Sequence, residues 1–204
     1  MMRKIVCSCE RSFESEMPDE ADLDAEGGLE DRILSGDFLA VTCPACGSLL
    51  KPEFPCRLRS AGRKIDILLV PELERIAFLR GRFPMPKDPP SRIAIGFPEL
   101  VEKLRILREG LDDRAVEAVK YHLLARIPEN LDSGDEPDIL FHGVEDGRIV
   151  FYMTGLKEGE VGVSRVGLEA YRKLADRMED AVAEEPYVSF CRPPYVSIKR
   201  ITRE

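Results

Sequence analysis

The sequence predicts an α+β fold in which a small β unit precedes a larger domain of helices and strands. Short apolar runs near closely spaced cysteines dominate the first part of the chain, whereas apolar residues at helical spacing appear in the second part. Four prolines between Gly81 and Ser91 are typical of a stiff connector. We therefore expect a first domain at 1–83, a connector at 84–90 and a second domain at 91–204.

Several short elements are expected in the first domain. We expect strands at residues 3–7, 49–54 and 64–70, a short helix at 29–34, and a helical turn at 72–79 that begins after Pro71. The apolar run at 38–42 leads directly into Cys43, which places that cysteine at the end of a strand.

A helix pair is expected at the start of the second domain. Pro98 suits the first turn of a helix that Gly110 ends. Asp112 or Asp113 is expected to cap the next helix, which closes at Pro128. The short turn between them is typical of two antiparallel helices.

A β-hairpin and a long helix are expected to follow the helix pair. The dipeptide Asp146-Gly147 separates two apolar runs and is a strong hairpin signal. Ser164 is expected to cap a long helix that extends to Met178. The tail at 187–201 is expected to be extended, with its two adjacent prolines at a sheet edge or outside a sheet.

The composition is that of a globular protein and does not favour a membrane protein or a disulfide scaffold. Of the 204 residues, 44% are hydrophobic and 33% are charged, as in ordinary globular proteins. The sequence has no apolar run of about 20 residues, so no membrane association is expected. The first residues lack an apolar signal segment, and we expect a cytoplasmic protein. Six cysteines are too sparse for a disulfide scaffold, and close pairs in a reducing compartment indicate metal ligands.

The net charge of −8 comes from one segment. Residues 10–31 contain ten acidic residues and one basic residue, and we expect them to form a solvated surface loop. The rest of the chain holds 29 basic and 28 acidic residues. Nucleic-acid-binding domains usually carry a basic stripe, and the sequence contains no evident one. A protein is therefore the expected partner, with nucleic acid ranked below it.

The sharpest motif is Cys43-Pro44-Ala45-Cys46-Gly47. Two thiolates three positions apart across a tight turn can face one tetrahedral ion, and zinc is the metal that such sites usually hold. Proline fixes φ in the turn, and glycine permits the positive φ that directs backbone N–H groups toward the sulfurs. Cys43 and Cys46 are therefore predicted to bind Zn²⁺.

Cys7 and Cys9 are the predicted second pair, with 33 residues between Cys9 and Cys43. On a flat strand the Cβ atoms of residues two apart lie roughly 6–7 Å from each other, so the backbone must bend to aim both sulfurs at one ion. Three alternatives stay open: a redox dithiol of Cys43 and Cys46, plain buried thiols, and a site in which Cys56 replaces Cys7.

The chain resembles the CpXC family of bacterial and archaeal proteins, named for paired Cys-Pro-X-Cys motifs. The resemblance extends beyond the cysteines to stretches at 33–37, 52–80, 102–106 and 110–117, and it therefore covers about residues 3–125. It implies metal-binding cysteines and assigns no activity. In this chain Cys-Ser-Cys stands where the family has its first Cys-Pro-X-Cys motif.

The remaining reactive residue types are expected to be structural. Cys56 and Cys191 lack partners in sequence and suit buried positions. His122 is expected at a helix margin and His142 partly buried on the hairpin, and two histidines are too few for a typical catalytic zinc site. Asp112-Asp113 is explained by a helix cap better than by an acid–base pair.

These features favour a non-enzymatic protein in which a structural zinc site of Cys7, Cys9, Cys43 and Cys46 supports a zinc-ribbon-like unit and a protein-binding surface. A thiol switch or enzyme that uses Cys43 and Cys46, and a nucleic-acid-binding zinc ribbon, are the alternatives. The sequence does not indicate the oligomeric state.

Overall fold

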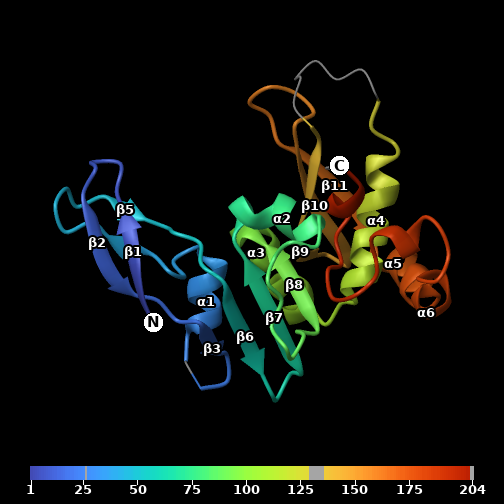
Figure 1. Cartoon of the computed structure of the whole chain (residues 1–204). Helices are drawn as coiled ribbons and strands as arrows, with labels where there is room; N and C mark the ends of the chain where they lie inside the picture. The colour runs from blue at the N-terminus through green and yellow to red at the C-terminus, as the bar shows by residue number, and fades with distance from the viewer. Residues whose placement is uncertain (26, 129–135, 203–204) are drawn as a thin grey trace. The chain divides into compact units, whose positions relative to one another are not determined.

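The computed structural model describes residues 1–25, 27–128 and 136–202 and confirms the α+β class (Figure 1). The chain divides into two compact units, Met1–Val101 and Glu102–Glu204, and the division falls within helix α3 (Gly96–Arg108). This division lies further along the chain than the expected connector at 84–90. The reason is that β8 (Arg92–Ile95) pairs with β7 (Ile65–Val70), so the residues directly after the prolines complete a sheet of the first unit.

That sheet has four strands in the order β3-β6-β7-β8. Strand β3 (Glu20–Asp22) is parallel to β6 (Cys56–Ser60), and β6 is antiparallel to β7. The connection from β7 to its parallel neighbour β8 passes through a 3₁₀ turn, η1 (Glu72–Glu74), and helix α2 (Arg75–Leu79). Strand β7 lies inside this sheet and nearly all of its residues are buried, so both of its faces are covered, which explains its nearly continuous apolar run.

Two small hairpins complete the first unit. Strand β1 (Met2–Val6) pairs antiparallel with β2 (Ser12–Glu16), and β4 (Val41–Thr42) pairs with β5 (Leu49–Leu50). The strand expected at 49–54 is therefore only two residues long. Each hairpin has one of the two cysteine pairs at its turn.

The acidic segment at 10–31 is not the surface loop that we expected. Within its described residues it forms β2, β3 and the start of helix α1 (Leu29–Leu34). Sparse apolar residues fix it: Phe13 lies opposite Ile5 in the hairpin, and Met17 and Ala21 are buried. The acidic side chains between them face outward, so the charge pattern concealed a secondary-structure pattern of period two.

The second unit begins with the predicted helices and hairpin. Asp112 is the cap of α4 (Asp113–Leu124), since its side chain accepts a hydrogen bond of 2.8 Å from the backbone N–H of Arg114. Strands β9 (Asp138–Glu145) and β10 (Arg148–Thr154) flank Asp146 and Gly147, which have φ angles of 48° and 72°. Two positive φ values in a two-residue turn are typical of a β-hairpin, as the Asp146-Gly147 signal predicts.

The expected long helix from Ser164 to Met178 is wrong. Ser164 lies in strand β11 (Gly162–Gly167), which extends the sheet to the order β11-β10-β9. Two short helices follow, α5 (Leu168–Ala175) and α6 (Met178–Ala181). Exposed and half-buried residues alternate along β11, as expected for an edge strand, and the helical apolar face begins only at Leu168.

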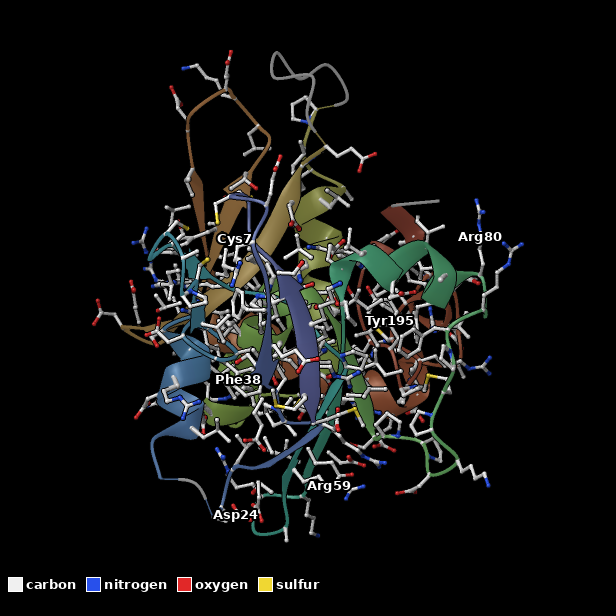
Figure 2. All side chains as sticks on the ribbon, turned by 60° about the vertical axis from the view of Figure 1, so that its left-hand side comes forward. Cys7, Asp24, Phe38, Arg59, Arg80 and Tyr195 are labelled. Atoms are coloured by element: carbon white, nitrogen blue, oxygen red, sulfur yellow. The ribbon has the colours of Figure 1, made fainter. Side chains whose placement is uncertain are left out.

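The tail is folded rather than extended. It forms a 3₁₀ turn, η2 (Tyr187–Ser189), and a short helix, α7 (Lys199–Thr202), and the two prolines lie outside the sheets. Tyr195 in this tail is fully buried in the second unit, as Phe38 is in the first (Figure 2).

Charged groups are also buried in the second unit. Lys120 of α4 has no exposed surface, and its ammonium donates to Glu102 at 2.9 Å and to Glu117 at 3.0 Å. Within the described ranges, no helix has the length and apolar character needed to cross a membrane.

Candidate metal centre

The turns of the two hairpins bring four sulfur atoms together. Cys7 Sγ lies 3.6 Å from Cys46 Sγ, and Cys9 Sγ lies 3.8 Å from Cys43 Sγ. All four sulfurs lie within 4.8 Å of one another. Cys7 marks this cluster in Figure 2. The structure therefore brings together the four cysteines that the sequence predicts as ligands.

The second cysteine turn (residues 43–48) has the predicted local structure. The N–H of Cys43 donates to the carbonyl of Ser48 at 2.9 Å, and the N–H of Gly47 donates to the carbonyl of Cys43 at 3.0 Å. Gly47 has a φ of 74°, in the left-handed region that glycine enters without steric cost. The turn thus holds both of its sulfurs on one side of the backbone.

The first cysteine turn (residues 7–11) also directs both of its sulfurs to one side, although it has one residue fewer between its cysteines. The N–H of Cys7 donates to the carbonyl of Arg11, and the N–H of Glu10 donates to the carbonyl of Cys7, each at 2.9 Å. Glu10 has a φ of 66°. In both turns, therefore, the residue after the second cysteine is left-handed, and the strand β1 ends before Cys7. This is the bend that the Cys-Ser-Cys spacing requires.

The sulfur separations fit a tetrahedral ion. With Zn–S bonds of about 2.3 Å, a regular tetrahedron places its sulfurs about 3.8 Å apart. Two of the six sulfur pairs, at 3.6 and 3.8 Å, agree with this value, and the other pairs lie within 4.8 Å. Cys7 and Cys43 are buried, whereas Cys9 and Cys46 are exposed, so the cluster lies at the surface with one cysteine of each pair turned inward. The four-cysteine group could hold a metal ion.

Hydrogen bonds in the second cysteine turn stabilise the thiolate forms of its two cysteines. The hydroxyl and backbone N–H of Ser48 lower the pKa of Cys46 to about 6. The N–H groups of Cys46 and Ala45 lower the pKa of Cys43. The N–H of Arg11 favours the Cys9 thiolate, but the neighbouring sulfurs of Cys46 and Cys7 outweigh it and raise the pKa of Cys9 to about 11. Four adjacent sulfurs cannot all carry charge unless a cation offsets it.

Serines beside the cysteines form a part of the site that the sequence analysis missed. Ser48 Oγ lies 3.2 Å from Cys46 Sγ, and Ser8 Oγ lies 4.0 Å from Cys7 Sγ. The available signal was the occurrence of a serine within two residues of a cysteine in both turns. Hydrogen bonds of this kind orient ligands and reduce their charge.

The other candidate residues lie elsewhere. Cys56 is buried in β6, and Cys191 is buried in the second unit, where burial raises its pKa to about 12. His122 is exposed and lies 2.8 Å from the hydroxyl of Tyr187. His142 is half-buried. Within the described residues, the four-sulfur group contains none of these side chains.

The fold and the site define an α+β protein whose N-terminal unit carries a four-cysteine group suited to a metal ion. The family model described as "CpXC protein" matches residues 5–120, more than half of the chain. The chain therefore belongs to the CpXC family. It is also similar to an uncharacterised protein of Treponema pallidum (strain Nichols), with 29% identity over 192 residues that cover 85% of this chain and 87% of the relative. No solved structure matches the chain significantly.

Proposed function

We propose that Cys7, Cys9, Cys43 and Cys46 bind one Zn²⁺ ion and that this ion has a structural role. The agreement between the observed sulfur separations and a tetrahedral Zn–S₄ site carries the proposal. Four protein ligands leave no open position for a water or substrate, which favours a structural role over a catalytic one. A reducing compartment such as the cytoplasm would keep the thiols available for the metal.

The two hairpins that carry the cysteines have short ladders, which a bound ion would stabilise. The β4–β5 ladder contains only two residue pairs, and the β1–β2 ladder contains five. Isolated two-stranded ladders are at best marginally stable in water. An ion bound to both turns would link them across 33 intervening residues and would contribute its binding free energy to the folding of this region.

We further propose that the first unit binds a protein partner. Several apolar side chains of this unit are exposed, among them Leu73 at 98%, Ile76 at 52% and Met85 at 41%. Leu73 and Met85 line a groove of about 720 Å³ with Phe54, Pro84 and other residues of the same unit. Exposed apolar clusters of this kind are typical of protein-interaction sites.

The zinc proposal is tested by metal analysis of the purified full-length chain. We expect one zinc per chain, and four thiols that react with a thiol reagent only after a chelator is added. Cys43→Ser should lose the metal, whereas Cys191→Ala, at a cysteine outside the cluster, should retain it. Zinc that Cys43→Ser binds as tightly as the parent protein does would contradict the proposed ligand set.

The same experiment distinguishes the structural zinc site from the redox alternative, in which Cys43 and Cys46 act as a thiol switch. The lowered pKa of Cys46, due first to the Ser48 hydroxyl, is the observation that favours a reactive thiol. A metal-free protein that forms a reversible Cys43–Cys46 disulfide would support the thiol switch and exclude the structural zinc site. A nucleic-acid-binding ribbon would instead require affinity that falls steeply with salt.

The partner proposal is tested with a photo-crosslinking amino acid at position 73 in cells. We expect crosslinks to a protein from position 73 and none from the matched control position 157, which lies on an exposed part of the second unit. Equal crosslinking from both positions would contradict a specific surface at Leu73.

A further inference from the structure

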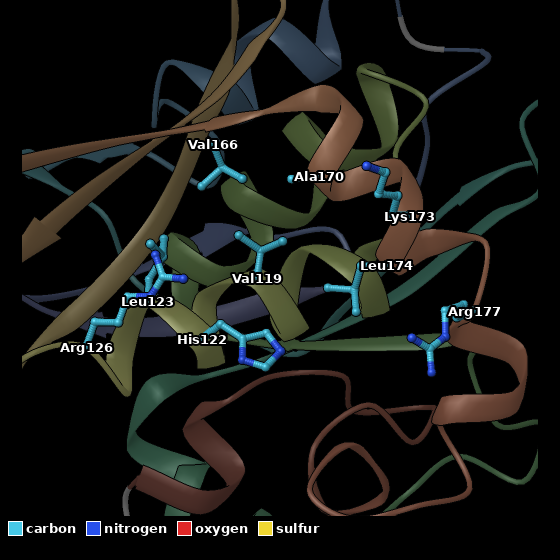
Figure 3. Close-up of a pocket in the computed structure, with 9 residues that line it drawn as sticks. All are labelled: Val119, His122, Leu123, Arg126, Val166, Ala170, Lys173, Leu174 and Arg177. Carbon is cyan, nitrogen blue, oxygen red and sulfur yellow. The ribbon is translucent and has the colours of Figure 1, made fainter.

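Helices α4 and α5 of the second unit enclose a groove of about 330 Å³, to which β11 contributes Val166 (Figure 3). The two helices contact each other. The volume is within the lower range of protein ligand sites. The floor of the groove is apolar and includes Val119 and Leu123 of α4 and Leu174 of α5.

The same residue pattern occurs on both helices. Apolar and basic residues alternate at positions i, i+3, i+4 and i+7, which share one face of a helix. On the α4 side the four are Val119, His122, Leu123 and Arg126, and on the α5 side they are Ala170, Lys173, Leu174 and Arg177. Each stripe therefore supplies two residues to the floor and two basic residues to the rim, and each ends in an arginine two positions beyond its helix.

The rim is basic although the chain as a whole is acidic. No carboxylate is among the described residues that line the groove. Lys173 contacts Glu169 at 3.0 Å, but both side chains are largely exposed. Within the described part of the chain, Arg126 and Arg177 have no ion-pair partner, and Figure 3 places them at opposite ends of the apolar floor.

We propose that this groove binds a peptide segment of a protein partner in which a large apolar side chain is flanked by acidic residues on both sides. The apolar side chain occupies the floor over Val119, Leu123 and Leu174, and the flanking carboxylates pair with Arg126 and Arg177. Arginine is well suited to this task because its guanidinium binds a carboxylate through two parallel hydrogen bonds.

The arrangement favours a peptide over a small anion. The groove is open along one side, so a ligand confined to it would remain partly exposed, whereas a polymer covers the groove with its own backbone. Cations at opposite ends of the floor also call for two anionic groups separated by an apolar one (Figure 3). A segment with alternating acidic and apolar residues supplies this chemistry. The site lies in the second unit and does not depend on the proposed zinc ion.

The proposal is tested by selecting binders from a random peptide library against the full-length protein. The double variant Arg126→Glu/Arg177→Glu serves for counter-selection. We expect enriched peptides with a large apolar residue between acidic residues. A fluorescein-labelled peptide of the enriched sequence should bind the double variant at least about tenfold more weakly, because two attractive charge pairs become repulsive. Its affinity for the parent protein should fall as salt increases.

Two further variants separate the contribution of the apolar floor from that of positive charge outside the groove. Ala170→Trp fills the floor from an exposed helix position and should abolish binding while the fold is retained. Arg172→Glu changes the same charge on the same helix outside the groove and should leave the affinity within about twofold of the parent.

Three outcomes would overturn the proposal. The first is a set of enriched peptides without the acidic–apolar–acidic pattern. The second is that Arg172→Glu weakens peptide binding as much as the double variant does, or that Ala170→Trp leaves binding unchanged. Either result would indicate that the peptide is attracted to the surface in general. The third is that decanoate displaces the peptide and binds more tightly than the peptide does, whereas decanol does not displace it. This result would assign the groove to a small amphipathic anion.

Discussion

At the scale of single residues, the backbone of Glu10 and Gly47 is the feature that aims the sulfurs. Both residues directly follow the second cysteine of a pair, and both have positive φ, at 66° and 74°. Glycine accepts this conformation freely, whereas a residue with a Cβ pays roughly 1–2 kcal/mol. The first turn is therefore strained at a position where the second is not.

Exchanging these residue types should change stability in opposite directions. Glu10→Gly should raise the free energy of unfolding by about 1 kcal/mol, because it relieves the strain in the first turn. Gly47→Ala should lower it by a similar amount, since a Cβ there meets no atom within 4 Å and only the backbone strain remains. Urea denaturation measures both, and Glu14→Gly in β2 is the control, because a glycine there should destabilise the strand.

Asp66 provides a residue-scale prediction about pH. Arg57 donates to its carboxylate through Nε at 2.6 Å and Nη2 at 2.7 Å, and this pairing lowers the pKa of Asp66 from its ordinary value. Because the folded pKa is below the unfolded one, the stabilisation is complete above about pH 4 and disappears as pH falls through the folded pKa.

We therefore expect Asp66→Asn to destabilise the protein most near neutral pH and progressively less below about pH 4. Free energies of unfolding of the variant and its parent, compared at each pH, isolate this effect from other acid-sensitive groups. The exposed Asp180→Asn is the control and should show little difference at any pH. A penalty for Asp66→Asn that grows on acidification would show that the sign is wrong.

At the scale of elements, apolar periodicity predicted some segments well and others poorly. The hairpin around Asp146 and Gly147 was predictable because its turn requires residues that tolerate positive φ. The strand at Ser164 was not, because serine also caps helices and the apolar residues from Leu168 onward suggested one continuous helix. In the acidic segment, the high charge obscured the buried Met17 and Ala21 that hold it to the rest of the unit.

Helix α4 also contains a buried ion network that hydrophobic patterning cannot reveal. Lys120 pairs with Glu102 and Glu117. The carboxylate of Glu102 accepts the N–H of Phe141 at 2.6 Å, and that of Glu117 accepts the N–H of Ile198 at 2.8 Å. Burial raises the pKa of Glu102, which Lys120 opposes. The network thereby attaches α4 to α3, to β9 and to the tail.

Lys120→Met should cost about 3–5 kcal/mol, because it leaves two carboxylates buried without their cation. The control Lys157→Met removes an exposed ion pair with Glu160 and should change stability by less than about 1 kcal/mol. Thermal or urea unfolding measures both. Adding Glu102→Gln to Lys120→Met should recover part of the loss, and a loss for Lys120→Met no larger than that for the control would contradict the importance of the network.

At the scale of the whole molecule, the sequence allowed the four-cysteine group and a two-part chain to be predicted, whereas the position of the boundary between the two units differs from the expected one. Cysteine spacing, with the proline and glycine of the second turn, identified Cys43 and Cys46, and the shorter first motif identified Cys7 and Cys9. The prolines at 84–90 suggested a domain boundary, but pairing of β8 with β7 is a long-range contact that no local signal reports.

The proposed ion should affect the two units differently. The sheet of the first unit has its own core, with Leu58, Leu69 and Ile93 fully buried, whereas the cysteine-bearing hairpins are short. We expect a chelator to increase hydrogen exchange at the amides of β1, β2, β4 and β5, because these short ladders would lose the ion that links their turns. The amides of β9 and β10 should keep their protection. Uniform loss of protection across the chain would contradict a local structural role.

The most direct test of the zinc site is X-ray absorption spectroscopy at the zinc edge on the purified full-length protein. Coordination by Cys7, Cys9, Cys43 and Cys46 predicts four sulfur ligands at about 2.3 Å. Cys9→Ser should reduce the sulfur count by one or release the metal, and Cys191→Ala should leave the spectrum unchanged. Nitrogen or oxygen ligands in the parent protein, or a sulfur count below four, would contradict the proposed site.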